Sequence, residues 1–380
     1  MNNRQKFEEK LIGPIERFDQ RNDMFRRARH DPEWVRRTLP FRERKPNRDR
    51  AGFGQEDFAL IEAAWHVEHE FAKGNRGSGL RGLYAWESPD PDTLPQSALE
   101  LTSPIDATRM VKRAARFFGA SLVGVCALDR RWLYSHVSND LTGEHLSLEV
   151  SEDYGYAVAM ALEMNYDYMQ TAPTGGSAAA TGLGYSKMAF VASLLAQFIR
   201  GLGYRALPSG NDTALSIPIA VEAGLGELGR NGLLITEPFG PRVRICKVLT
   251  DLPLVPDEPH FFGVTEFCKT CMKCATDCPS QAITYDGRTT KAPTLSNNRG
   301  VLKWPTNPEQ CYKYWIANRL DCASCIRVCP FNQPQGWQHD MARAAIKNLP
   351  QLNPIILRVG NLLRYGEQRD PATIWEDRHA

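Results

Sequence analysis

Blocks of apolar and polar positions between about residue 104 and residue 201 predict alternating helices and strands. An amphipathic helix with Ser103 at its N-cap is expected over 104–118. The apolar run over 121–128 predicts a short buried strand, and 156–164 predicts another strand or buried segment. A long helix is expected over 175–201, because apolar side chains recur along it and glycines close it. This alternation indicates an α/β or α+β core.

The flanking segments differ from the core in composition, which suggests domain boundaries. The N-terminal part is rich in charge and interrupted by Pro and Gly, with one helix expected over 57–73. The Pro-rich, acidic stretch 253–260 is a natural boundary before a block of cysteines. The predicted units are an N-terminal region 1–103, a core 104–255, a cysteine-rich domain 256–334 and a C-terminal segment 335–380 that packs on the core.

Composition narrows the class of protein. The chain has 380 residues, 42% of them hydrophobic and 24% charged, which is enough for two or three domains. A net charge of +2 is too small to favour nucleic acid or an anionic membrane as the main partner. The longest near-apolar stretch, 188–199, is shorter than a bilayer span, and a mean hydropathy of −0.40 fits a soluble protein.

The N-terminus bears on the compartment. The polar first fifty or so residues do not match a secretory or twin-arginine signal, so we expect a cytoplasmic protein. Export with membrane association is the alternative if the chain is a processed form.

Eight of the ten cysteines fall between residues 268 and 329. Two related runs, C-x2-C-x2-C-x3-C-P and C-x10-C-x2-C-x3-C-P, match the bacterial ferredoxin pattern for two [4Fe–4S] clusters; zinc ribbons or disulfides are the alternatives. In this pattern the fourth cysteine of each run binds the other cluster. The predicted ligands are Cys268, Cys271, Cys274 and Cys329 for one cluster, and Cys278, Cys311, Cys322 and Cys325 for the other.

The remaining motifs carry less information. Cys126 and Cys246 lie outside both runs and are expected to be buried structural thiols. The segment 224–229 spells G-x-G-x-x-G without a clear strand before it, so its small residues are predicted to allow close approach of a large planar ligand. A D-x-H-x-x-G cobalamin signature is absent, and His260 is predicted to be a loop histidine.

Several segments resemble the corrinoid- and iron–sulfur-dependent reductive dehalogenases. They are 14–22 (PIERFDQRN), 120–125 (ASLVGV), 169–173 (MQTAP), 184–188 (GYSKM), 221–226 (VEAGLG), 239–244 (FGPRVR) and 263–268 (GVTEFC). The resemblance implies a nitroreductase-like α/β core in residues 104–255 that binds a base-off corrinoid (a cobalamin) with no protein histidine below the cobalt. It also implies that the ferredoxin-like domain with two [4Fe–4S] clusters is inserted into this fold.

The resemblance also implies the chemistry. Replacing a carbon–halogen bond by carbon–hydrogen needs two electrons and a proton, and Co(I) is the implied reductant. Tyr185 matches the family's proton donor, and Arg244 matches the cation that stabilises its anion. Asn211 matches an amide that contacts the tyrosine. Thr181 lies one helical turn before Tyr185 on the same face.

The substrate and partners follow from the same likeness. The aromatic residues that match the family's substrate pocket are Phe25, Trp65, Phe71 and Trp315. Organohalides are apolar, and a dry aromatic pocket would both hold them and exclude water. The implied electron source is a low-potential donor such as a ferredoxin, a flavodoxin or a quinol-linked system. No nucleic-acid partner is expected, and a homodimer is possible.

Two other functions share parts of this pattern. An epoxyqueuosine reductase would use the same cofactors on tRNA, and would need a basic surface and a carboxylate acid. The near-neutral charge and the sequence around Tyr185 favour the dehalogenase instead. A plain iron–sulfur electron-transfer protein would keep the cysteines and lack a corrinoid.

Overall fold

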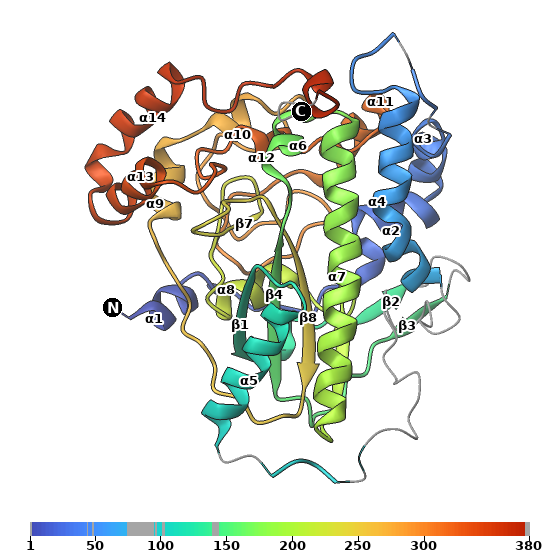
Figure 1. Ribbon diagram of the computed structural model, residues 1–380, viewed down its shortest axis with the longest axis vertical. Helices are drawn as coiled ribbons and strands as arrows, with labels where there is room; N and C mark the ends of the chain where they lie inside the picture. The colour runs from blue at the N-terminus through green and yellow to red at the C-terminus, as the bar shows by residue number, and fades with distance from the viewer. Residues whose placement is uncertain are drawn as a thin grey trace.

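A four-stranded antiparallel sheet forms the centre of the structure, a computed structural model that describes residues 2–43, 45–47, 49–73, 95, 97–100, 103–138 and 144–376 (Figure 1). The strand order is β1-β4-β8-β5. The strands are β1 (Leu122–Ala127), β4 (Tyr156–Glu163), β8 (Val243–Thr250) and β5 (Ala206–Ser209). All three neighbouring pairs run antiparallel, so α+β is the fitting description of this core.

Helices cover both faces of the sheet. Helices α5 (Pro104–Phe117) and α7 (Gly175–Gly201) pack on one face, and α8 (Ser216–Glu222) packs on the other. Successive residues of β4 alternate between the two sides, with Met160 facing α7 and Ala159 facing α8. The sheet is therefore buried on both faces, which explains why β4 is apolar along its whole length.

Helix α7 is the central helix of the fold, and α4 (Gln55–Lys73) runs along it (Figure 1). Glycine and alanine in the first half of α7 let α4 approach closely. By length and composition α7 could cross a membrane, although 56% of its most apolar stretch is buried within the protein, as in a core helix. It is longer than the 188–199 stretch that the sequence singled out.

The N-terminal region contributes short helices and docks onto a small hairpin. Its helices are α1 (Asn3–Glu8), η1 (Gln20–Asn22), α2 (Met24–His30) and α3 (Pro32–Arg42). The hairpin consists of β2 (His136–Ser138) and β3 (His145–Ser147). A backbone bridge joins Asp19 to His136, which fixes the segment before α2 beside the hairpin.

The cysteine-rich region is built from short helices around its sulfur atoms. They are α9 (Val264–Thr270), α10 (Lys273–Thr276), α11 (Pro308–Asn318) and α12 (Ser324–Arg327), with β6 (Glu227–Leu228) and β7 (Leu234–Ile235) beneath them. Helices α13 (Trp337–Asn348) and α14 (Asn353–Leu362) follow and pack on α9 (Figure 1).

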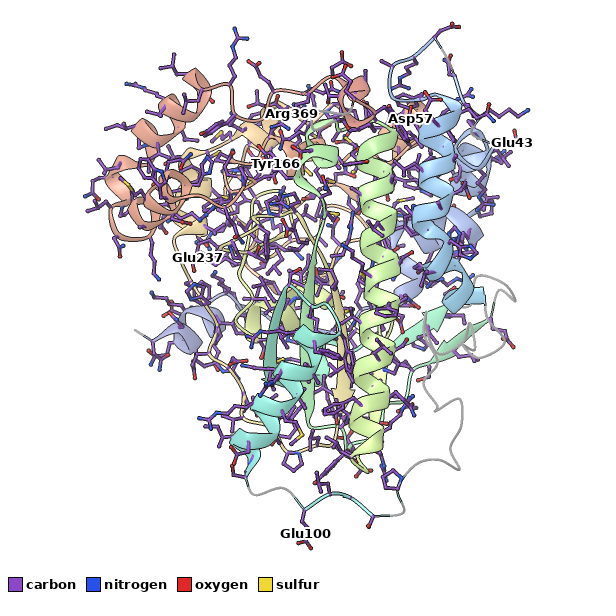
Figure 2. The ribbon with its side chains drawn as sticks, viewed as in Figure 1. Glu43, Asp57, Glu100, Tyr166, Glu237 and Arg369 are labelled. Carbon is purple, nitrogen blue, oxygen red and sulfur yellow. The ribbon has the colours of Figure 1, made fainter. Side chains whose placement is uncertain are left out.

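The last described segment returns to the core. The indole nitrogen of Trp375 donates to the Asp57 carboxylate at 3.2 Å, near the start of α4. The Arg369 guanidinium lies 5.3 Å from the ring centre of Tyr166, in helix α6 (Tyr166–Gln170). Figure 2 labels Asp57, Tyr166 and Arg369 at this end of the molecule. The C-terminal segment thus connects the ends of α4 and α6.

Most helices and strands of the core lie where the sequence predicts them. Helix α7 has the predicted bounds, and α5 and β1 differ from theirs by one residue at an end or at both. Burial of Cys126 and Cys246 is confirmed, and all ten cysteines are free of disulfides. The mixed helix-and-sheet prediction is confirmed; its nitroreductase-like detail and its domain boundaries remain predictions.

The glycine-rich segment 224–229 has a different explanation from the predicted one. A Cβ added at Gly226 would lie 2.1 Å from the backbone oxygen of Ile235, and one at Gly224 would lie 2.6 Å from that of Glu258. Gly224 also has a φ of +74°, which favours glycine. These glycines are required by close packing of the chain against itself, so the expected approach of a planar ligand does not explain them.

Candidate active site

Four residues that the sequence singles out as catalytic candidates meet at α7 and the sheet. Thr181 and Tyr185 lie one turn apart on α7, and residues at i and i+4 share a helix face. Arg244 comes from β8, and Asn211 from the turn after β5. The structure therefore brings together side chains from three elements. Thr181 and Arg244, the pair most distant in sequence, are 63 residues apart.

Arg244 reaches α7 at a point where a glycine leaves room for it. Its Nη2 donates to Thr181 Oγ1 at 3.2 Å, and its guanidinium carbon lies 5.1 Å from the ring centre of Tyr185. A Cβ added at Gly184 would lie 2.7 Å from Arg244 Cγ. Arg244 Nε is buried and has no hydrogen-bond partner among the described residues. The site therefore combines a cation over the tyrosine ring with an unsatisfied buried donor.

Asn211 contacts the tyrosine directly. Its amide nitrogen donates to the Tyr185 hydroxyl at 2.8 Å; Tyr185 is half-buried and Asn211 is exposed. A donor on the phenol oxygen stabilises the negative charge that the oxygen carries after losing its proton. The Tyr134 hydroxyl in turn donates to the backbone oxygen of Asn211 at 3.2 Å, which restrains the turn.

A lysine that the sequence analysis did not identify holds this turn. Lys247 of β8 is fully buried, and its Nζ donates to the backbone oxygens of Gly210 and Asp212 at 2.5 and 3.0 Å. These two residues flank Asn211. The Asp212 carboxylate also accepts from the backbone nitrogen of Gly210 at 2.7 Å. Burial lowers the pKa of Lys247 to about 8, and Asp212 partly opposes that shift.

Trp65 of α4 stacks on the tyrosine ring. Its ring lies 4.7 Å from that of Tyr185 at an interplanar angle of 22°, and it occupies the space left by Gly182, where an added Cβ would lie 2.4 Å from Trp65 Cδ1. Phe71, the next predicted pocket residue on α4, has its backbone near the end of the helix, and its side chain lies outside the described part of the chain.

The other two predicted pocket aromatics belong to a second cluster. Phe25 of α2 lies 5.3 Å from Trp315 of α11 between ring centres, and 5.7 Å from Tyr312. Phe41 and Trp34 also contact Tyr312. The described ring contacts of Trp65 are instead with Tyr185 and His69. The predicted pocket residues thus form two aromatic groups, of which one contacts the tyrosine.

A buried carboxyl group near the site was not identified from the sequence. Glu68 lies one turn after Trp65 on α4 and is 5% exposed, while its backbone nitrogen donates to Ser186 Oγ of α7 at 3.2 Å. Burial, and to a lesser degree the Asp212 charge, raises the pKa of Glu68 to about 7. An acidic group three residues after an aromatic one on a mostly apolar helix is the signal that could have identified it.

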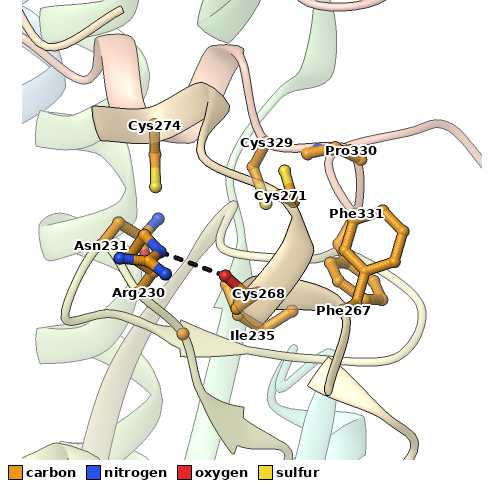
Figure 3. A pocket seen from close by; sticks show the side chains of 11 residues that line it. Arg230, Asn231, Ile235, Phe267, Cys268, Cys271, Cys274, Cys329, Pro330 and Phe331 are labelled. Carbon is orange, nitrogen blue, oxygen red and sulfur yellow. Dashed lines mark hydrogen bonds between the residues drawn. The ribbon is translucent and has the colours of Figure 1, made fainter. Parts of the chain in front are cut away.

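Four cysteines surround one hollow in the cysteine-rich region, with a volume of about 310 Å³ including its open side. Figure 3 shows the side chains of Cys268, Cys271, Cys274 and Cys329 around it, with the Arg230 Nε donating to the Cys268 backbone oxygen at 3.1 Å. Burial raises the pKa of Cys268 to about 12 in the absence of metal. Cys329 belongs to the second sequence run, so this group crosses between the two runs.

The other four cysteines form a second group. Burial, followed by repulsion from Cys322 and Cys278, raises the pKa of Cys311 to about 12. The pKa of Cys325 lies well above its ordinary value for the same reasons, with Cys311 its strongest electrostatic neighbour. Four converging thiol groups suit the ligand set of an iron–sulfur cluster, which binds them as thiolates. The first predicted ligand set lines one hollow, and electrostatic coupling indicates that the other four thiols lie near one another. Their roles as cluster ligands remain predictions.

Comparison with known proteins gives a match for the cysteine-rich region. Residues 267–332 match the 4Fe–4S double cluster binding domain family. This match covers both cysteine runs and supports two iron–sulfur clusters.

Curated proteins of similar sequence align with most of the chain. A tetrachloroethene reductive dehalogenase from Sulfurospirillum multivorans is 38% identical over 351 residues, which are 84% of this chain and 70% of that protein. One from Dehalobacter restrictus is 37% identical over 358 residues, 76% of this chain and 64% of that protein.

A solved structure has a similar fold. It is the catabolic reductive dehalogenase NpRdhA in complex with 3-bromo-4-hydroxybenzoic acid, with a TM-score of 0.73 and 23% identity. The match covers 94% of this chain and 48% of that chain, so the present chain spans about half the length of that protein.

Proposed function

Since the chain belongs to the reductive dehalogenase family, we propose that it replaces a carbon–halogen bond of an organohalide by carbon–hydrogen, with Tyr185 supplying the proton. The observation that carries the assignment of Tyr185 is its set of contacts: an amide donor from Asn211, a cation from Arg244 and a stacked indole from Trp65. The reaction consumes two electrons and one proton and releases a halide ion.

The contacts of Tyr185 suit proton donation. When the hydroxyl gives up its proton, the oxygen becomes negative, and the Asn211 amide already donates to that oxygen at 2.8 Å. The Arg244 guanidinium adds a permanent positive charge over the ring. Thr181 accepts from Arg244 and keeps the guanidinium beside the tyrosine. These contacts stabilise the product of proton transfer more than its starting state, which is how a general acid accelerates a reaction.

The electrons are proposed to arrive through the two cysteine groups. Two [4Fe–4S] clusters, one bound by each group, would carry single electrons from a low-potential donor of the ferredoxin, flavodoxin or quinol-linked type. Asn211 and Arg244 would lie against a corrinoid bound beside Tyr185, and this group would supply the low-potential reductant for the carbon–halogen bond. The buried Arg244 Nε has no hydrogen-bond partner among the described residues, and the Asn211 side chain is exposed, so both are polar groups with which a large ligand could interact.

The substrate is proposed to bind against aromatic surface. Trp65 presents an indole face beside the proton donor, and Phe25 and Trp315 form a second aromatic wall on α2 and α11. Apolar, halogenated rings or alkenes bind favourably to such surfaces because both shed ordered water.

Substitution of the proton donor tests the proposal. Tyr185→Phe in the protein reconstituted anaerobically with clusters and corrinoid should lower halide release by about 100-fold or more, because the acid is lost while the ring remains. The screen uses chlorinated and brominated aromatics and alkenes with a Ti(III) reductant. Absorption and EPR spectra of the cofactors should be unchanged.

The matched control is Tyr285→Phe, since this tyrosine is exposed in the cysteine-rich region. It should retain full halide release. Undiminished release in Tyr185→Phe would remove Tyr185 as the donor. Failure of the reconstituted protein to hold a stoichiometric corrinoid would instead favour a plain electron-transfer protein.

A further inference from the structure

Three potential metal ligands lie together outside the candidate active site. They are Asp19, His136 and His145, whose ligand atoms all lie within 4.8 Å of one another, and all three side chains are half-buried. We propose that they bind one divalent transition-metal ion of the zinc class. Two imidazoles and a carboxylate are donors that such ions prefer, and three protein ligands leave a position for water.

Backbone pairing brings the three residues together. In the β2–β3 hairpin, His136 pairs with Ser147 and Ser138 pairs with His145, so the two histidines lie diagonally on one face. Their ring centres are 4.8 Å apart. Asp19 reaches the same place through its parallel bridge to His136. The convergence is therefore a result of the fold and does not depend on flexible side chains alone.

Neighbouring groups orient the donor atoms. His136 Nδ1 forms a hydrogen bond with Ser135 Oγ at 3.1 Å. The Asp19 carboxylate accepts from the Arg21 backbone nitrogen at 2.9 Å, while its two oxygens lie 2.9 and 3.0 Å from His145 Nε2. Hydrogen bonds of this kind around metal ligands fix ring orientation and tautomer.

Ion binding requires a small adjustment. A tetrahedral zinc ion lies about 2.1 Å from its nitrogen and oxygen ligands, so these atoms are about 3.4 Å apart. The ligand atoms lie within 4.8 Å of one another, so some must come closer to reach that spacing, while the Asp19 oxygens and His145 Nε2, at 2.9 and 3.0 Å, must move slightly apart. The Asp19–His145 hydrogen bond would be replaced by shared coordination.

The bound ion would fasten the N-terminal segment to the core. Phe18 and Gln20, on either side of Asp19, already bond to the hairpin: the Ser135 nitrogen donates to the Phe18 oxygen, and the Ser138 nitrogen donates to Gln20 Oε1. Helix α2 begins shortly after, at Met24. Occupancy would therefore raise the stability of the segment from Asp19 to α2. This inference does not depend on the proposed catalytic function.

Zinc binding by the cluster-loaded protein tests the inference. The cysteines must be occupied by iron–sulfur clusters, because free thiolates would also bind zinc. After anaerobic chelator washing, equilibrium dialysis against ZnCl2 with elemental analysis should find one more zinc per wild-type chain than per His136→Ala/His145→Gln chain. The control His260→Gln alters a histidine that pairs with Glu237 at 2.7 Å elsewhere, and it should bind zinc as the wild type does.

Asp19→Asn provides a second variant that should fold. Its side-chain oxygen still accepts from the Arg21 nitrogen, so the local turn is kept while the negative ligand is lost. We expect zinc affinity at least about ten-fold weaker than that of the wild type. Unchanged affinity in this variant, or equal zinc content in the wild type and the double histidine variant, would overturn the proposal.

Discussion

The turn that carries Asn211 depends on a residue that does not touch Tyr185. Lys247 is a positioning residue, because its Nζ holds the two backbone oxygens on either side of Asn211. Burying an ammonium group is unfavourable unless its hydrogen bonds are satisfied, and three oxygen acceptors satisfy this one, Ser216 Oγ being the third. Loss of Lys247 should release the Asn211 amide from the Tyr185 hydroxyl.

Lys247→Met should therefore lower kcat for halide release about ten-fold or more, with a smaller change in KM. In an Asn211→Ala background the same substitution should have little further effect, since the group it positions is already gone. Lys187→Met, which changes an exposed lysine of α7, is the control. An equal loss in both backgrounds, with intact cluster spectra, would show that Lys247 acts only on general stability.

Glu68 should make stability depend on pH. The native pKa of about 7 lies above the ordinary value of 4.5, so the folded protein holds more protons than the unfolded chain between these values. The stabilising contribution of the protonated group is fully present below about pH 4.5 and is lost as pH rises through about 7.

Glu68→Gln removes this titration. Relative to the wild type, its Tm should rise by about 3 °C between pH 5 and pH 8, measured by thermal unfolding of the cluster-loaded protein. Glu62→Gln, an exposed position on the same helix, is the control and should show no such trend. A constant difference in Tm across this range would show that Glu68 keeps its ordinary pKa.

At the scale of single residues, the sequence predicts the side chains whose chemistry is known from a related family. Tyr185 and Arg244 were reached through family resemblance, and the structure places them together. Lys247 and Glu68 were missed because their roles arise from burial and from neighbours distant in sequence. Phe25 and Trp65 were predicted to line one pocket, but they belong to two aromatic groups. Residue type alone cannot show which aromatic side chains lie together.

Among the elements, the contact between α4 and α7 has the clearest local requirement. Trp65 lies against Gly182, where a methyl group would meet the indole at 2.4 and 2.5 Å. The tryptophan stacks on Tyr185 from this position. The closeness of the two helices therefore determines the aromatic side of the candidate site.

Gly182→Ala should push Trp65 away from Tyr185. We expect a loss of stability of about 1–3 kcal/mol from overpacking, together with reduced halide release. Gly201→Ala is the matched control at the end of the same helix, because no atom lies within 4 Å of the added methyl group. It should be neutral or stabilise the protein by up to about 1 kcal/mol, since alanine favours helix. Equal Tm values for the two variants would contradict the tight contact.

Local signals explain which elements were predictable. Helix α5 has a serine cap followed by proline, and α7 ends at a glycine. The start of α5 and the end of α7 are therefore determined by a few neighbouring residues. Strand β8 was missed because Arg244 and Lys247 interrupt its apolar pattern. The structure shows that these two charges serve opposite faces of the sheet, with Arg244 toward α7 and Lys247 toward the Asn211 turn.

For the whole molecule, the crossing of the two cysteine groups makes a specific prediction. Cys329 lies with Cys268 and Cys274, although its sequence neighbours Cys322 and Cys325 belong to the other group. Cys329→Ser should therefore damage one cluster and lower the iron content by about half, in accordance with four thiolates per cluster.

Two double variants distinguish this grouping from grouping by sequence neighbours. Cys329→Ser with Cys274→Ser should lose no more iron than either single variant, because both ligands serve one cluster. Cys329→Ser with Cys311→Ser should lose nearly all of it. Iron analysis and EPR after anaerobic reconstitution give the answer, and the reverse pattern would contradict the crossed arrangement.

At this scale the sequence predicted the mixed helix-and-sheet core and the sulfur groups, because regular spacing of cysteines determines which of them can converge. It did not reveal the antiparallel strand order or the contact of Trp375 with Asp57. Both depend on pairing between segments that are distant in the chain, for which no local pattern exists.

The position of Cys329 also has a consequence for biosynthesis. Proteins leave the ribosome from the N-terminus, so Cys268, Cys271 and Cys274 emerge well before the residue that completes their group. Cys278 is likewise synthesised before the other three members of its group, Cys311, Cys322 and Cys325. Neither set of sulfurs is complete in a nascent chain until the end of the cysteine-rich region has been synthesised. Metal insertion into the two groups is therefore expected to be a late and closely coupled event.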